Sequence, residues 1–244
     1  MKKIFRPTKG PEDWKQLLAE PQKHWKTGFS AKALAYCWEQ ADGFPESVKT
    51  VFRNSGAGLF ENVKLVTAFP EYQVPLPPDK GHPSQNDIFV LANGKGQLIS
   101  IMVEGKVSES FGETVSEWIK DNSKGKQERL NFLLNKLQLK DAQIQAIRYQ
   151  LLHRTASAII MAEKFAAKNA LMLVHSFSQT DKWFEDYAKF LALFRLKAEI
   201  NSMAGVKNIN GIDLYFSWVR GEEKYLNEEF LTSAKPVEQD VYRV

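Results

Sequence analysis

The sequence predicts an α/β protein in which helices flank a mixed central β-sheet. Residues 86–91 and 99–107 look like two adjacent strands, and apolar and polar side chains alternate along the second. Residues 170–177 are nearly all apolar, which is typical of a strand at the centre of a sheet. Residues 141–168 repeat apolar side chains at three- and four-residue steps, which indicates an amphipathic helix. A helix between two such strands favours the α/β class.

The first part of the chain predicts short helices followed by one strand. Ser30 is a good N-cap for a helix that would end near Gly43 and Pro45. Residues 70–83 are rich in proline, so we expect an extended connection there. The expected elements are helices at 12–18, 30–40 and 45–52 and a strand at 63–69.

The second part of the chain predicts further helices alternating with strands. Asp141 is the expected N-cap of the long helix, because an acidic side chain is favoured at the positive end of the helix dipole. Alternating apolar residues at 211–219 predict a last strand. The expected elements are helical segments at 112–119, 128–137, 141–168 and 181–200 and strands at 170–177 and 211–219.

Composition is that of an ordinary soluble globular protein. The 244 residues are 43% hydrophobic and 25% charged, which is enough to bury a sizeable core. We expect one domain over residues 1–244, with a helical extension at 1–29, a core at 30–220 and a tail at 221–244 that frays.

Several classes of protein lack their usual sequence features here. The single cysteine, Cys37, excludes an intramolecular disulfide and a zinc site built on several cysteines, and it favours a cytoplasmic location. No secretory signal is recognisable, and no eighteen apolar residues run together, so we expect no membrane association. The motifs typical of NTPases, dinucleotide-binding enzymes, zinc proteases and serine hydrolases are missing from the sequence.

Positive charge is concentrated in one stretch of the chain. The net charge is +4, but eight basic residues stand against three acidic ones between Lys120 and Arg154. A basic strip of this kind could follow a phosphate backbone. The alternative is a solvated helical surface without a ligand.

Three charged side chains converge on the predicted hairpin. If its loop centres on Lys95 and Gly96, Asp87 faces Glu104, and Lys106 lies on the same face as Glu104. Two carboxylates can share one Mg²⁺, which prefers oxygen ligands. A lysine beside them could orient a metal-bound water or offset charge on a phosphate.

This pattern resembles the signature of a known enzyme superfamily. Asp87, sixteen further residues and then Glu104-Gly105-Lys106 resemble the D…(D/E)xK motif of the PD-(D/E)xK nucleases, which include restriction-type and RecB-type enzymes. The resemblance implies a restriction-endonuclease-like αβββαβ core and hydrolysis of phosphodiester bonds in nucleic acid. We expect DNA as the substrate, although the sequence does not separate DNA from RNA. It implies Mg²⁺, with Mn²⁺ as an alternative, held by Asp87 and Glu104 and assisted by Lys106.

The resemblance extends to residues outside the hairpin. Several members carry a glutamate on the helix before the first strand, and Glu39 is the nearest match for this additional metal ligand. RecB-type members carry QxxxY on the later helix, and here Gln150 is followed by Arg154 in place of tyrosine. We therefore expect Gln150 in the catalytic site and Arg148 and Arg154 in substrate binding. The segments VEGKV and RYQLLHRTASA also resemble those of an uncharacterised bacterial protein family.

Other interpretations stay open. An ExK sequence on a strand can be an ordinary solvated charge pair. The fold could serve as a non-catalytic binding or interaction module, or as a metal-dependent enzyme for a small molecule. A homodimer is a further alternative.

Overall fold

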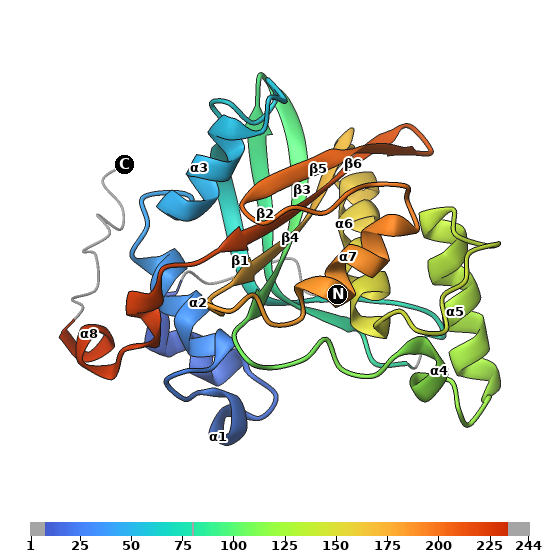
Figure 1. Cartoon of the computed structure of the whole chain (residues 1–244), viewed down its shortest axis with the longest axis horizontal. Helices are drawn as coiled ribbons and strands as arrows, with labels where there is room; N and C mark the ends of the chain where they lie inside the picture. The colour runs from blue at the N-terminus through green and yellow to red at the C-terminus, as the bar shows by residue number, and fades with distance from the viewer. Residues whose placement is uncertain (1–7, 80, 234–244) are drawn as a thin grey trace.

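The computed structural model describes residues 8–79 and 81–233. Its centre is a mixed, open β-sheet (Figure 1). Within these residues, six strands lie in the order β1-β2-β3-β4-β6-β5. Their bounds are β1 Lys64–Val74, β2 Ser84–Gly94, β3 Gln97–Lys106, β4 Asn169–Ser176, β5 Ser202–Ile209 and β6 Ile212–Arg220. Strands β1 to β3 form an antiparallel meander, β3, β4 and β6 run parallel, and β5 is antiparallel to β6. The α/β class with a mixed sheet is confirmed.

Helices cover both faces of this sheet (Figure 1). Helices α2 (Ser30–Glu39) and α3 (Glu46–Asn54) pack on the face to which Ile88 and Val90 point. Helices α5 (Lys124–Leu137), α6 (Tyr149–Lys164) and α7 (Phe184–Ala192) pack on the face of Phe89 and Leu91. Every residue of β4 is buried because both of its faces are covered.

The β2–β3 hairpin has the register that the sequence predicts. Ile88 pairs with Val103, and Gly94 pairs with Gln97. Lys95 and Gly96 between them have φ values of 49° and 78°. A two-residue turn with two positive φ angles matches the twist of the flanking strands, so this short loop fixes the register.

The long helix expected over residues 141–168 is wrong in its first part. Helix α6 begins at Tyr149, and the preceding residues form turns. Backbone hydrogen bonds from Val115 to Ile147 and from Tyr149 to Glu113 tie this segment to the neighbouring chain. These bonds use peptide groups that a helix would need, so Asp141 is not an N-cap. Helix α7 also stops earlier than expected.

Two strand predictions need correction. Strand β5 was not predicted, although the Asn210-Gly211 turn that joins it to β6 is a strong hairpin signal. Strand β1 continues through Pro70 to Val74, so the first part of residues 70–83 is a strand. A proline is tolerated there because β1 lies at the edge of the sheet, where its missing N–H costs no ladder bond.

Both terminal regions pack against the core as far as the structure describes them. The N-terminal extension holds the 3₁₀ helix η1 (Pro11–Leu17) and the short helix α1 (Pro21–His24). In the tail, η2 (Glu223–Leu226) and α8 (Glu228–Ser233) bury Tyr225 and Leu231, so fraying is wrong for this part. Residues 234–244 lie outside the described chain. None of the helices in the described ranges is long and apolar enough to cross a membrane.

Candidate functional site

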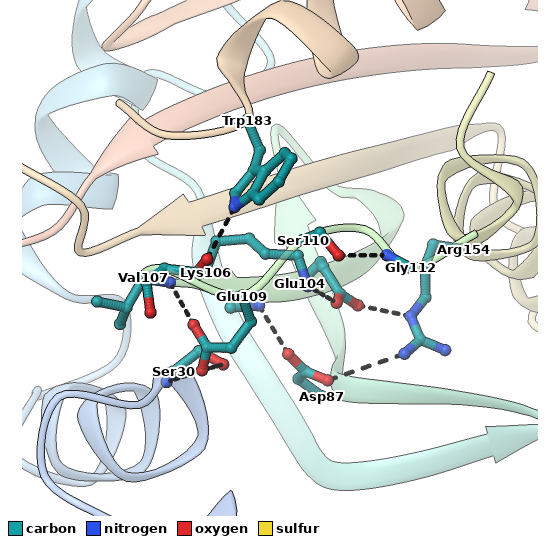
Figure 2. A network of polar contacts seen from close by, with 12 residues as sticks. Ser30, Asp87, Glu104, Lys106, Val107, Glu109, Ser110, Gly112, Arg154 and Trp183 are labelled. Atoms are coloured by element: carbon teal, nitrogen blue, oxygen red, sulfur yellow. Dashed lines mark hydrogen bonds and ion pairs between the residues drawn. The ribbon is translucent and has the colours of Figure 1, made fainter. Parts of the chain in front are cut away.

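Three acidic side chains lie abreast where β2 begins and β3 ends. The β1–β2 pairs Pro70–Ile88 and Tyr72–Asn86 place Glu71 opposite Asp87. The β2–β3 ladder runs up to Ile88–Val103, which places Glu104 at the level of Asp87. Helix α6 packs on the sheet near these strand ends and brings Arg154 to the carboxylates (Figure 2). The predicted neighbours Asp87 and Glu104 are thus joined by Glu71, which the sequence analysis missed.

Glu104 is the centre of a buried ion-pair network. Its Oε1 accepts a hydrogen bond from Lys106 Nζ at 2.6 Å, and its Oε2 accepts one from Arg154 Nε at 2.6 Å (Figure 2). Glu104, Lys106 and Arg154 are 1%, 4% and 7% exposed, so these charges are almost completely removed from water. Burial alone would raise the pKa of Glu104, but the Arg154 and Lys106 charges and their hydrogen bonds lower it. Glu104 is therefore ionised at neutral pH.

Asp87 is held less tightly than Glu104. Its Oδ2 accepts a hydrogen bond from the Gly105 backbone N–H at 2.7 Å, and its Oδ1 lies 3.9 Å from Arg154 Nη2. Burial and the Glu104 charge raise the pKa of Asp87 to about 7. Burial and the Asp87 charge raise the pKa of Glu71 to about 8. Three carboxylates facing two cationic side chains therefore leave an excess of negative charge when all are ionised.

The donor chemistry of Asp87 and Glu104 fits a hard divalent cation. An ionised carboxylate has about four lone-pair positions, and the hydrogen bonds to Asp87 and Glu104 use only some of them on each residue. Mg²⁺ commonly takes one or two carboxylates and completes its shell with water and substrate oxygens. Within residues 8–79 and 81–233, no three His, Cys, Asp or Glu side chains are grouped to hold a metal ion by themselves.

Gly105 allows the close approach of Asp87 to the end of β3. A Cβ at this position would lie 3.3 Å from Asp87 Oδ2 and 3.2 Å from Leu34 Cδ2. Both contacts are tighter than usual, and the same residue donates its N–H to Asp87. The residue between Glu104 and Lys106 is therefore small because the carboxylate and α2 pack against it.

Gln150 and Arg154 lie one turn apart on the same face of α6. The Gln150 Oε1 atom is buried and has no hydrogen-bond partner among the described residues. Such an acceptor is costly unless water or a ligand satisfies it. Arg154, which we expected to bind substrate, is instead part of the carboxylate network.

Arg148 and Glu39 lie apart from this network. Arg148 donates to Asp186 Oδ2 and to the Gly112 carbonyl, both at 2.7 Å. Glu39 lies at the end of α2, where its Oε1 accepts hydrogen bonds from Thr8 Oγ1 and Trp14 Nε1. Ser30 and Leu34, in the first half of that ten-residue helix, are the α2 residues beside Gly105. The structure therefore does not bring Glu39 together with Asp87 and Glu104.

The expected basic strip is partly used in internal contacts. Arg129 donates to the Pro77 carbonyl, Lys126 donates to the Trp118 carbonyl, and Lys136 pairs with Glu163. These side chains hold the 76–78 segment, α4 (Val115–Trp118) and α6 in place.

Ser84 and His153 also belong to the site and were not predicted. Ser84 Oγ lies 3.3 Å from Arg154 Nη1 and 2.8 Å from His153 Nδ1. Glu71 could have been found by continuing the β1 alternation past Pro70, which places it level with Asp87. Ser84 and His153 carry no comparable signal, because their contact joins residues 69 positions apart.

One family model matches most of the chain. It describes a domain of unknown function, DUF6946, and covers residues 7–223. No curated protein and no solved structure matches the chain. The matched range includes every residue of the site described above.

Proposed function

The chain belongs to the DUF6946 family of unknown function, and from its site we propose that it is a divalent-metal-dependent nuclease that hydrolyses phosphodiester bonds in DNA. One observation carries this proposal. Glu104 and Lys106 are buried together at the end of β3 and form an ion pair at 2.6 Å. Asp87 lies beside them, and its nearest cationic group, on Arg154, is 3.9 Å away. A buried lysine and two carboxylates in this arrangement suit phosphoryl chemistry better than they suit a structural role alone.

The order of the elements supports the proposal. Helices α2 and α3 precede the antiparallel strands β1 to β3, and helices α4 to α6 and then the parallel strand β4 follow. This order is compatible with a restriction-endonuclease-like αβββαβ core.

Each side chain of the site has a defined part in the proposed reaction. Asp87 and Glu104 would hold Mg²⁺ or Mn²⁺, which would supply Lewis acidity and a more acidic bound water. Lys106 and Arg154 provide fixed positive charges that favour a phosphoryl group gaining negative charge. Gln150 offers an unpartnered oxygen that can accept a hydrogen bond from water.

The direct test measures cation binding and cleavage together. We expect calorimetry to detect Mn²⁺ or Mg²⁺ binding by the wild type, and Asp87→Asn and Glu104→Gln to abolish it. We expect the same variants to lower cleavage of plasmid and single-stranded DNA by at least about a hundredfold. Glu113→Gln is the matched control, because Glu113 is exposed. A wild type that binds no divalent cation and cuts no DNA contradicts the proposal.

A second function, a non-catalytic nucleic-acid-binding module, is favoured by one observation. Both carboxylate oxygens of Glu104 are already paired, with Lys106 and Arg154. Such a network can persist as a fixed structural element. This function predicts DNA binding, measured by fluorescence anisotropy, that needs no divalent cation, is unchanged in Asp87→Asn and is accompanied by no cleavage.

A further inference from the structure

Arg154 needs more than its carboxylate partners to stay in one orientation. The residue is 7% exposed, and its guanidinium carries five N–H donors in a planar fork. The Nε donor meets Glu104 at 2.6 Å, whereas Nη2 lies 3.9 Å from Asp87 Oδ1, beyond hydrogen-bond distance. The remaining corner, Nη1, donates to Ser84 Oγ at 3.3 Å. Ser84 thus supplies the second hydrogen bond that fixes the plane of the guanidinium.

The Ser84 hydroxyl contacts both Arg154 and His153 and can satisfy both at once. Arg154 can only donate, so the Ser84 oxygen accepts from it. The hydroxyl proton is then free to be donated to His153 Nδ1, 2.8 Å away. This requires a neutral His153 with its proton on Nε2. Burial, Arg154 and Arg129 lower the pKa of His153 well below its ordinary value, so the ring is neutral. In the other neutral tautomer, Nδ1–H donates to the Ser84 oxygen, and the contact between the two side chains is kept.

His153 is itself held in place by aromatic packing. Its ring lies 4.9 Å from the Tyr149 ring, which stacks on Trp118 at 3.8 Å. Ser84 is 2% exposed at the start of β2, where it pairs with Val74. Strand pairing therefore fixes Ser84, and aromatic contacts fix the His153 ring, without using the Arg154 side chain.

We propose that Ser84 and His153 are positioning residues, which hold the Arg154 guanidinium on Glu104 through two linked hydrogen bonds, one between Arg154 and Ser84 and one between Ser84 and His153. These two hydrogen bonds fix the orientation of the Arg154 guanidinium, because its 3.9 Å contact with Asp87 is too long to do so. The consequence for catalysis rests on the proposed function, but the positioning of Arg154 does not.

The test measures the Arg154 Nε–H directly. Its ¹⁵N nuclear magnetic resonance signal is identified by its loss in Arg154→Lys, and its hydrogen exchange is followed in the full-length protein. Because a hydrogen bond to a charged group is worth roughly a tenfold to hundredfold change in an equilibrium, we expect exchange to accelerate by about that factor in Ser84→Ala and in His153→Phe. In His153→Asn we expect exchange close to that of the wild type, because asparagine Oδ1 lies as far along its side chain as histidine Nδ1.

A matched control separates this effect from the loss of any buried hydroxyl. Ser100 is 0% exposed on β3 and donates to the Ala158 carbonyl at 2.9 Å, without contacting Arg154. We expect Ser100→Ala to leave the Arg154 signal and its exchange unchanged. Thermal unfolding confirms that each variant is folded. If Ser84→Ala does not fold, the comparison of His153→Phe with His153→Asn decides the proposal alone.

The outcomes separate the positioning role from the proposed function. If exchange of the Arg154 Nε–H is unchanged in folded Ser84→Ala or His153→Phe, the positioning role is wrong. Equal acceleration in His153→Phe and His153→Asn also contradicts it. If the wild type cleaves DNA, Ser84→Ala and His153→Phe should lower kcat by about tenfold or more with little change in KM, and His153→Asn should restore it. A wild type that cleaves nothing defeats the proposed function, while the exchange measurement still decides the positioning of Arg154.

Discussion

Arg154 is a charged side chain in a position where an unpaired charge would be very costly. It is 7% exposed, and its guanidinium is compensated by Glu104 and, at longer range, by Asp87. Removing one partner from a buried pair leaves the other charge desolvated and uncompensated. The stability of this part of the molecule therefore depends on the pair being complete.

Replacing Arg154 should destabilise the protein far more than replacing a surface cation. We expect Arg154→Ala to lower the free energy of unfolding by about 3 kcal/mol, because Glu104 keeps only Lys106 and Asp87 loses its nearest cation. Denaturant unfolding measures this. Lys136→Ala is the control, because its pair with Glu163 is 20% and 44% exposed, and we expect it to cost less than about 1 kcal/mol. Equal losses in the two variants would mean that the buried network adds nothing to stability.

At the level of single elements, helix α2 obtains its cap from another part of the chain. Its N-cap residue, Phe29, has no capping side chain. Glu109, from the loop after β3, accepts hydrogen bonds on Oε1 from the Ser30 N–H at 2.7 Å and the Ser30 hydroxyl at 3.0 Å. Its Oε2 accepts from the Val107 N–H at 3.0 Å. The carboxylate thus caps α2 and ties it to the end of the strand that carries Glu104 and Lys106.

Loss of this cap should weaken α2 by a moderate amount. We expect Glu109→Ala to lower the free energy of unfolding by about 1 kcal/mol, because an N–H at the positive end of the helix loses its acceptor. Glu113→Ala removes an exposed carboxylate from the same loop, and we expect a change within about 0.5 kcal/mol. Thermal or denaturant unfolding distinguishes the two, and a cost for Glu109→Ala no larger than that of the control would contradict the capping role.

For the whole molecule, the carboxylate row makes stability depend on pH. The pKa of Asp87 rises from 3.8 to about 7 and that of Glu71 from 4.5 to about 8, mainly because folding partly removes both from water. The folded protein therefore keeps protons that the unfolded chain releases. Stability from this source is fully present below about pH 4 and is lost as pH rises through 7 and 8.

Stability should accordingly fall between pH 6.5 and about pH 8 and level off above it, because both carboxyl groups are then ionised in the folded protein as well. Each carboxyl group contributes a slope of up to about 1.4 kcal/mol per pH unit. Burial lowers the pKa of His175 from 6.5 to about 3, so this histidine changes stability between these two pH values, below the range of the test. We expect Glu71→Gln to make the decline shallower, as measured by urea unfolding across the range. Glu61→Gln, at an exposed position, should leave the decline as it is in the wild type, and an identical decline in Glu71→Gln would refute this account.

The predictable part of the fold and site is the part set by local geometry. The Lys95-Gly96 turn fixed the hairpin register, and period two then placed Glu104 and Lys106 on one face beside Asp87. The apolar run at 170–177 correctly indicated a central strand. The start of α6 could not be predicted, because backbone bonds to residues 113–116 replace helical ones before Tyr149.

The sequence by itself determined the α/β class, the hairpin and the pairing of an aspartate with an ExK strand, because adjacent segments joined by a short turn have few ways to meet. Only the tertiary structure decided that Arg154 pairs with Glu104 across 50 residues, that Glu71 joins the row, and that Glu39 stays at the far end of α2. Those contacts depend on how α6, β1 and α2 pack on the sheet. The packing of these elements, and not residue spacing in the sequence, determines which charged side chains come into contact.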